Sequence, residues 1–189
     1  MARLILASSS PRRRELLAQI GIIPDIIECS DVDEIHHKNE DPRQYVLLIA
    51  KEKAIAIAEK NKSDLILAAD TIVVCGGKIL AKAENNLDVE KYLKKLSGRQ
   101  HTVMTSVCVV VPLGSLLTKI VTTKVKFKRL STIEIQKYIK SGEGIGKAGG
   151  YAIQGMAGSF VKNINGSYSA VVGLPLYETI GMLRSKNDI

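Results

Sequence analysis

The sequence predicts an α/β fold built on a mixed β-sheet, and three observations carry this prediction. Helical and strand-like segments alternate in the first half of the chain, as in units of strand, helix and strand. Glycine-centred turns between β-branched runs then predict antiparallel hairpins in the second half. With 189 residues, of which 46% are hydrophobic, the chain is long enough to bury a substantial core.

The first predicted strand and helix indicate an anion site. The apolar run 4–7 leads into three serines at 8–10, of which Ser10 is a good N-cap before Pro11 at the first helical position. Arginines at 12–14 then fill the first turn, where the helix dipole disfavours cations. Backbone N–H groups, hydroxyls and guanidinium groups together are typical of a phosphate site. A solvated basic helix end is the alternative.

The remaining elements follow from apolar periodicity, caps and chain breakers. Asp41 and Pro42 begin a long helix that ends near Asn61, and a capping box at Ser131 begins a later one. Asn165-Gly166 predicts a hairpin turn between strands 160–164 and 168–172. The other predicted elements are strands at 25–28, 65–74, 78–80, 102–111 and 116–130, and helices at 87–96 and from about 175.

A carboxylate lies inside the most apolar of these strands. Asp70 stands within 65–74, where burial is costly unless the charge is paired, bound to a metal or open to a cleft. A general base, or a ligand of a divalent cation, is therefore expected there, with a lysine from elsewhere as a further possible partner. A carboxylate satisfied by backbone N–H groups is the alternative.

An acidic cluster of Asp31, Asp33 and Glu34 follows a short predicted strand. Such carboxylates can bind Mg²⁺, which takes one or two protein carboxylates and keeps several waters. A solvated acidic loop explains the same residues equally well.

Several lysines are candidates for contacts with phosphate or nucleic acid. Lys53 lies toward the apolar side of the second helix, and Lys82 follows the hairpin after the Asp70 strand. The alternative for Lys82 is a surface lysine near a turn, and the alternative for Lys53 is a lysine at the edge of the apolar stripe that extends its ammonium group to water. Lys124, Lys126 and Lys128 alternate with Val125 and Phe127 along a strand, so the lysines share one face. That face lacks the interleaved aromatic side chains that nucleic-acid binding favours, and lysines that protect an exposed strand from aggregation are the alternative.

The amino-acid composition limits which partners and which cellular location can be expected for the protein. The net charge of +8 favours polyanionic partners. No apolar run reaches the length of a membrane span, and the segment after Met1 lacks the layout of a signal peptide. The three cysteines are isolated, as in a reducing compartment. A cytoplasmic protein without membrane contact is expected.

Five motifs, taken together, resemble those of the Maf-like nucleotide pyrophosphatases. They recur in the family's order over nearly the whole chain, as Ser8-x-Ser10-Pro11-Arg12-Arg13, Ala69-Asp70-Thr71, Leu96-Ser97-Gly98-Arg99, Lys147-Ala148-Gly149-x-Tyr151-x-Ile153-Gln154-Gly155 and Val172-Gly173-Leu174-Pro175. The resemblance implies a single domain over residues 1–189 with a fold like that of inosine triphosphate pyrophosphatases. That fold is an elongated mixed sheet flanked by helices, with two lobes around a central cleft.

The resemblance also implies hydrolysis of a nucleoside triphosphate to the monophosphate and pyrophosphate, with Mg²⁺ or Mn²⁺ as cofactor. It implies a homodimer and no nucleic-acid partner. The intact Ile153-Gln154-Gly155 is similar to the branch that acts on dTTP and UTP, which cleans nucleotide pools and is linked to cell-division arrest. The alternatives are a pyrophosphatase for 7-methyl-GTP or modified purine triphosphates, and a non-enzymatic inhibitor of septum formation that binds nucleic acid.

Roles transfer residue by residue where the motifs match. Asp70 matches the proton acceptor and, with Asp33, is the expected metal ligand. The chain departs from the family at Gly146, where an aspartate is usual. The positions expected to set substrate choice are Arg12, Thr71 and Gln154, and those expected to bind phosphate are Ser8, Ser10, Arg13, Lys53 and Lys82.

Overall fold

The computed structural model describes residues 2–30, 32, 34, 40–112 and 114–184. The chain forms two compact units. Unit 1 comprises Met1–Asp70, Thr105–Val121 and Gly173–Ile189, and unit 2 comprises Thr71–Met104 and Thr122–Val172. The boundaries at residues 70, 104 and 121 fall inside the long strands β3 (Leu65–Cys75), β5 (Gln100–Val110) and β6 (Leu116–Phe127), so each of these strands contributes to both units.

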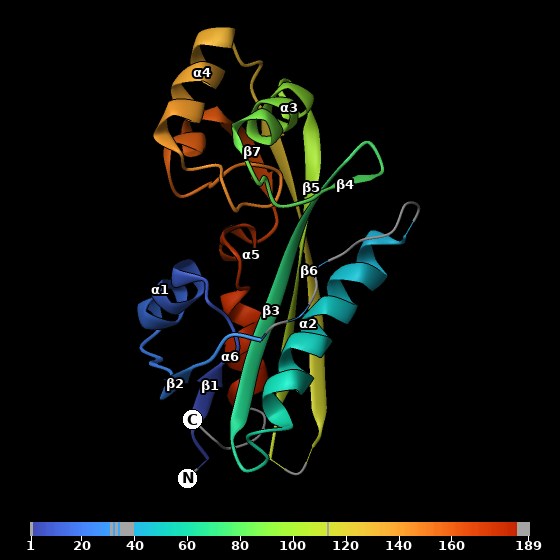
Figure 1. Ribbon diagram of the computed structural model, residues 1–189, viewed down its shortest axis with the longest axis vertical. Helices are drawn as coiled ribbons and strands as arrows, with labels where there is room; N and C mark the ends of the chain where they lie inside the picture. Colours follow the sequence, from blue (N-terminus) through green and yellow to red (C-terminus); the bar gives the residue numbers. More distant parts are fainter. Residues whose placement is uncertain (1, 31, 33, 35–39, 113, 185–189) are drawn as a thin grey trace. The chain divides into compact units, whose positions relative to one another are not determined.

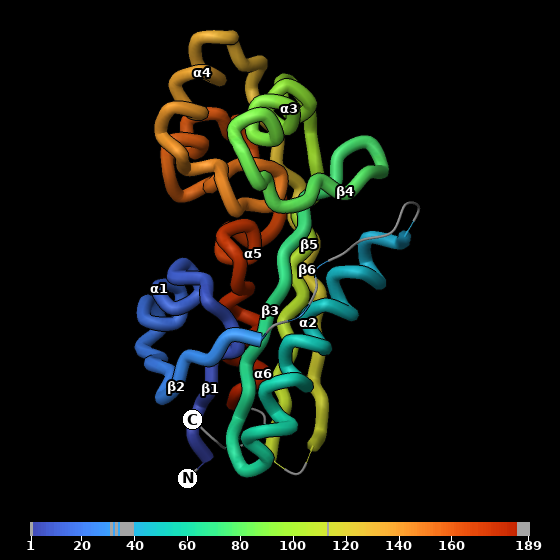
Figure 2. Tube along the Cα trace, viewed as in Figure 1, coloured from blue at the N-terminus to red at the C-terminus, as the bar shows by residue number. Residues whose placement is uncertain are grey.

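Unit 1 is built around parallel strands. Its further elements are β1 (Leu4–Leu6), α1 (Pro11–Gln19), β2 (Ile26–Ile27), α2 (Pro42–Ala58) and α6 (Leu176–Arg184). Strand β1 lies between β2 and β3, with Ile5 opposite both Ile26 and Ile66. Helix α2 runs alongside β3, as Figures 1 and 2 both show.

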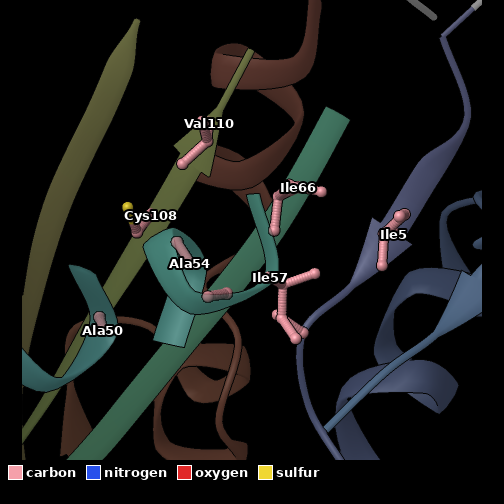
Figure 3. Packing of buried hydrophobic residues seen from close by; sticks show 9 residues of the cluster. Ile5, Ala50, Ala54, Ile57, Ile66, Cys108 and Val110 are labelled. Atoms are coloured by element: carbon pink, nitrogen blue, oxygen red, sulfur yellow. The ribbon is translucent and has the colours of Figure 1, made fainter. Parts of the chain in front are cut away.

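The core of unit 1 joins α2 to the sheet. Ala50 and Ala54 of α2 are fully buried against a cluster that includes Ile66 of β3 and Cys108 of β5 (Figure 3). Because alanine side chains are short, the helix axis can approach the strands closely. Burial raises the pKa of the Cys108 thiol to about 12, as expected for an inert core residue. This packing fixes the face that α2 presents to β3.

Unit 2 contains antiparallel strands and two packed helices. Its elements are β4 (Lys78–Leu80), α3 (Asn86–Leu96), α4 (Thr132–Ser141), the 3₁₀ helix η1 (Met156–Phe160), β7 (Val161–Asn165) and α5 (Tyr168–Val172). Helices α3 and α4 lie against each other (Figure 2). A group of aromatic rings in this unit packs edge to face, contributed by His101, Phe127, Tyr138, Tyr151 and Phe160.

The described strands pair in the order β2-β1-β3-β5-β6-β7, with β4 on β3. Parallel pairing at β1 and antiparallel pairing at β3–β4 and β6–β7 make the sheet mixed. The predicted α/β class with a mixed sheet flanked by helices is therefore confirmed, while the cleft between two lobes stays a prediction. None of the described helices has the length and apolar character needed to cross a bilayer.

Two of the predicted helix caps form. The side chain of Asp41 accepts a hydrogen bond from the backbone N–H of Arg43 at the start of α2. At the start of α4, Ser131 and Glu134 form both hydrogen bonds of a capping box. The pKa of Glu134 falls to about 2, mainly because Lys128 donates a hydrogen bond to its carboxylate. Local sequence signals were sufficient at these positions, because cap and helix are neighbours in the chain.

The predicted hairpin at Asn165-Gly166 is wrong. Strand β7 pairs with β6 instead, and residues 168–172 form helix α5. The hydroxyl of Ser167 accepts a hydrogen bond from Ala170 N, which caps the helix, while Ser167 N donates to Thr123 Oγ1. Gly166 has φ 129°, and a Cβ there would lie 2.7 Å from Thr123 Oγ1. The Ser167 cap and the close approach of Gly166 to Thr123 therefore outweigh the β propensity of the short run 168–172.

Candidate functional site

A buried lysine lies between two carboxylates in unit 1. Lys53 Nζ donates hydrogen bonds to Asp70 Oδ1 and Glu34 Oε1, each at 2.7 Å. Lys53 is 7% exposed and Asp70 only 3%. The ammonium group offsets part of the cost of burying the Asp70 carboxylate inside β3.

Helix α2 places Lys53 at this point. Tyr45, Ile49 and Lys53 are spaced four residues apart, so they share one helix face, and all three are buried. The packing of Ala50 and Ala54 holds that side of the helix against the sheet. The sequence placed Lys53 toward the apolar side of the helix, but its burial and its two carboxylate partners, which come from other segments, are seen only in the structure.

Tyr45 is hydrogen-bonded to the backbone of Glu34. Its hydroxyl donates a hydrogen bond of 3.0 Å to the backbone oxygen of Glu34. Burial raises the pKa of Tyr45 to about 12, with smaller contributions from the charges of Asp70 and Glu34, so the hydroxyl remains a donor at neutral pH. Tyr45 was not among the site residues predicted from the sequence. The one sequence-based argument that could have identified Tyr45 is that a buried tyrosine hydroxyl usually requires a hydrogen-bond partner.

Arg13 connects the loop after β1 to the turn before α6. Its Nη1 donates to Ser8 Oγ at 2.8 Å and its Nε donates to Gly173 O at 2.9 Å. Burial lowers the pKa of Arg13, and attraction to Asp70 and Glu34 opposes this effect. The guanidinium group is therefore electrostatically coupled to the two carboxylates.

The start of α1 keeps its cationic character. Ser10 occupies the N-cap position, but its side chain makes no capping hydrogen bond, so the expected side-chain cap is wrong. Ser10 N instead donates to Ser8 Oγ at 3.3 Å. No acidic residue lies in the first turn. Arg12 and Arg13 are half-buried, whereas Arg14 is exposed, so the three arginines differ in their surroundings.

The other predicted site residues belong to unit 2. Thr71 follows Asp70 on β3 and is half-buried. Lys82 is exposed and forms an isolated β-bridge with Ala148, which ties the segment after β4 to the loop after α4. Gln154 is exposed in a turn that follows the buried Ile153. Their joint action with Asp70 stays a prediction.

The predicted metal ligand Asp33 lies outside the described residues. Within the part of the chain that the structure describes, no three His, Cys, Asp or Glu side chains gather as a metal-binding group. Asp70 and Glu34 nevertheless lie within hydrogen-bond distance of the same Lys53 nitrogen, so their carboxylates are close together. Mg²⁺ characteristically takes one or two carboxylates together with phosphate and water oxygens. The donor set fits such an ion.

The family assignment follows from a comparison of the whole chain. The family described as Maf-like protein matches residues 3–186, which include every predicted site residue. The chain belongs to the Maf-like protein family. The resemblance inferred from the five motifs is thereby confirmed.

Close relatives of this Maf-like chain carry one name. A protein from Caulobacter vibrioides is 51% identical over 180 residues, covering 95% of this chain and 93% of its own, and is named dTTP/UTP pyrophosphatase. Proteins from Hyphomonas neptunium and Brucella abortus, 51% and 49% identical, carry the same name. They cover 96% of this chain each, and 94% and 90% of their own lengths.

Solved structures are more distant from this Maf-like chain. A HAM1 protein from Coxiella burnetii has a TM-score of 0.46 and 14% identity, over 69% of this chain and 75% of that one. A nucleoside-triphosphatase, also titled dITP/XTP pyrophosphatase, from Mycobacterium abscessus has a TM-score of 0.40 and 14% identity, over 67% and 75%. The family assignment therefore rests on the sequence comparisons.

Proposed function

We propose that this Maf-like protein hydrolyses dTTP and UTP to the nucleoside monophosphate and pyrophosphate. The name shared by relatives about half identical over nearly their whole length supports the reaction and the substrates. The observation that carries the proposal in this chain is the buried Asp70 carboxylate held by Lys53 beside Glu34. Strong desolvation of a paired carboxylate is common where a side chain must take part in proton transfer.

In the proposed reaction, the oxygen of a water molecule attacks the α-phosphorus. The bond from that phosphorus to the oxygen bridging the α- and β-phosphates breaks, and pyrophosphate leaves with the bonding electrons. Asp70 accepts the proton that the water loses. Lys53 keeps the base in place through its 2.7 Å hydrogen bond. Fixing the base before the substrate arrives lowers the entropic part of the barrier.

Cationic and hydroxyl groups would hold the phosphates. The α1 start offers Arg12, Ser8 and Ser10, and Arg13 lies close enough to interact with the Asp70 charge. Lys82 of unit 2 would be a further phosphate-binding residue. Fixed positive charges at developing negative charge contribute strongly to such reactions.

Asp70 and Glu34, with Asp33, would hold a divalent cation, Mg²⁺ or Mn²⁺. Such an ion, when bound, supplies positive charge to the phosphate oxygens. Lys53 keeps the Asp70 and Glu34 carboxylates near each other before substrate arrives.

Arg12, Thr71 and Gln154 would set substrate choice. The side-chain amide of glutamine has both a donor and an acceptor, which suits the edge of a pyrimidine base. Gln154 is exposed and therefore available to a ligand. The proposal includes residues 1–189 as one catalytic domain.

The proposal also includes a cellular location and an oligomeric state. A cytoplasmic location fits Cys29, Cys75 and Cys108, which are free thiols. We further propose a homodimer that acts on free nucleotides rather than on nucleic acid.

A nucleotide panel tests the proposed function. Pyrophosphate release is measured with dTTP, UTP, dCTP, dITP and 7-methyl-GTP, with Mg²⁺ or Mn²⁺. We expect dTTP and UTP to be the best substrates, and Asp70→Asn to lower kcat by about 10²–10⁴-fold, since a general base contributes on this scale. Asp41→Asn is the matched control, because asparagine caps a helix as well as aspartate does.

Three results would overturn the proposal. A wild-type rate for folded Asp70→Asn would exclude Asp70 as the proton acceptor. Preferred hydrolysis of dITP or 7-methyl-GTP would exclude the assigned substrates. Absence of any turnover, with steeply salt-dependent DNA binding, would favour a nucleic-acid-binding protein instead.

A further inference from the structure

The turn that carries Gln154 is held from both sides inside unit 2. Two residues before Gln154, the backbone N–H of Ala152 donates a hydrogen bond of 3.0 Å to the hydroxyl of Tyr138. Two residues after it, the backbone N–H of Met156 donates a hydrogen bond of 2.9 Å to Glu143 Oε2. The exposed Gln154 side chain therefore projects from a backbone segment that is hydrogen-bonded on both sides of it.

The carboxylate of Glu143 packs against the backbone of this turn at Gly155. A Cβ added to Gly155, the residue after Gln154, would lie 2.1 Å from Glu143 Oε2. The space that a side chain at 155 would need is therefore occupied by the carboxylate. Glycine at this position allows the carboxylate to reach the N–H at the start of η1, where negative charge is also favoured by the N–H groups of the helical turn.

Both fixed points come from the end of helix α4. Tyr138 lies in its last turns, and Glu143 follows Gly142, the C-cap with φ 71°. The backbone N–H of Glu143 donates to Ser141 Oγ at 3.3 Å, which links the residue to the helix end. The capping box at Ser131 stabilises the start of the same helix, so the turn is hydrogen-bonded to a capped helix.

A third contact supports the segment just before the turn. The hydroxyl of Tyr151 lies 2.8 Å from His101 Nε2 on β5, and both side chains are buried among aromatic rings. Burial lowers the pKa of His101 to about 4, so the ring is neutral at physiological pH. The entry to the turn is therefore anchored in the core, and Glu143 supplies the anchor at its exit.

We propose that Glu143 is a positioning residue for Gln154 and thereby determines how well the protein discriminates among nucleobases. The inference rests on the proposed function, in which Gln154 contacts the base. Glu143 acts through the backbone of the turn and takes no part in proton transfer. Its loss changes base recognition while the chemistry around Asp70 is retained.

Steady-state kinetics with dTTP, UTP and dCTP test the inference. We expect Glu143→Ala to raise KM for dTTP and UTP about fivefold to tenfold, the scale of one lost intramolecular hydrogen bond, with kcat changed less than about twofold. Glu143→Gln retains an acceptor oxygen, so it should recover KM to within about twofold of wild type. Gly155→Ala displaces the carboxylate without removing it and should resemble Glu143→Ala.

A double-mutant cycle separates positioning from general destabilisation. If Glu143 acts through Gln154, adding Glu143→Ala to Gln154→Ala should raise KM less than about twofold further, because the recognition is already lost. Glu90→Ala is the matched control, since it removes a carboxylate that pairs with Lys94 on the surface of α3. Full additivity in the cycle, or equal loss of kcat for all nucleotides, would overturn the inference.

Amide hydrogen exchange makes failure of the inference distinguishable from failure of the proposed function. Glu143→Ala should speed exchange of the Met156 amide at least about fivefold, while Gln154→Ala should leave it nearly unchanged. Unchanged Met156 exchange in Glu143→Ala would exclude the contact itself. If wild type hydrolyses no nucleotide, the proposed function fails, and with it the role of Glu143 in recognition, whatever the exchange data show.

Discussion

Lys53 Nζ lies 2.7 Å from Asp70 Oδ1, and the same nitrogen lies 2.7 Å from Glu34 Oε1. The lysine comes from α2, the aspartate from β3 and the glutamate from the segment between β2 and α2. Three separate segments therefore meet at one ammonium group. Because one ammonium group compensates both carboxylates, the stability of unit 1 depends on residues that are also proposed for catalysis.

Removing the lysine should destabilise the protein. Lys53→Met leaves two carboxylates without their shared cation, and the free energy of unfolding should fall by about 3–5 kcal/mol, measured by urea denaturation. Adding Asp70→Asn removes one of the unpaired charges and should restore part of that loss without restoring activity. Lys60→Met, at an exposed position just beyond α2, is the control and should change stability little. Equal stability of Lys53→Met and wild type would contradict the prediction.

The arginines at the start of α1 should differ in importance. Arg13→Ala breaks two hydrogen bonds, to Ser8 Oγ and Gly173 O, and removes a half-buried positive charge. We expect kcat/KM for dTTP to fall at least about 100-fold, on the scale of lost electrostatic stabilisation. Arg14→Ala alters an exposed residue and should stay within about twofold of wild type. Similar losses in the two variants would refute the distinction.

Tyr45 should affect the requirement for the metal ion. Tyr45→Phe removes the hydrogen bond to the backbone of Glu34 and leaves the ring in place. The Mg²⁺ concentration at half-maximal activity should rise about fivefold, equivalent to about 1 kcal/mol for one hydrogen bond. Tyr177→Phe is the matched control, because Tyr177 is 85% exposed. An unchanged Mg²⁺ titration would show that Tyr45 does not position the Glu34 segment.

Stability should depend on pH through His101. Burial lowers its pKa to about 4 in the folded state, against an unfolded value near 6.5, so the unfolded chain binds the extra proton first on acidification. The contribution of the neutral His101 ring to the free energy of unfolding is complete above pH 6.5. It is lost as pH falls from 6.5 to 4, by up to about 3 kcal/mol. His101→Gln should lack this part of the pH dependence, measured as unfolding free energy against pH. Titration of the His101 ring near pH 6.5 in an NMR experiment would disprove the prediction.

Local sequence signals predicted the elements well where the deciding groups are neighbours in the chain. Asp41 caps α2, and Ser131 with Glu134 caps α4, as their spacing predicts. The same reasoning failed at Gly166, because contacts of Ser167 and Gly166 with Thr123 decide that turn. Residues 44 apart in sequence meet there, which no local pattern reports.

The candidate site was only partly accessible from the sequence. Asp70 was conspicuous because a charge inside an apolar strand needs compensation. Its lysine partner could not be chosen by the same argument, since Lys53 and Lys82 were both plausible. Tyr45 and Glu143 were missed because their roles depend on single hydrogen bonds to backbone atoms of distant segments.

The sequence by itself determined the α/β class, the capped starts of α2 and α4, and the need of Asp70 for a partner. These depend on periodicity, on caps and on the cost of burying charge, which act within a few residues. Only the tertiary structure decided that Lys53 is that partner and that Arg13 reaches Gly173, 160 residues away. The physical reason is packing: Ala50 and Ala54 let α2 approach the sheet, and that approach selects which side chains meet.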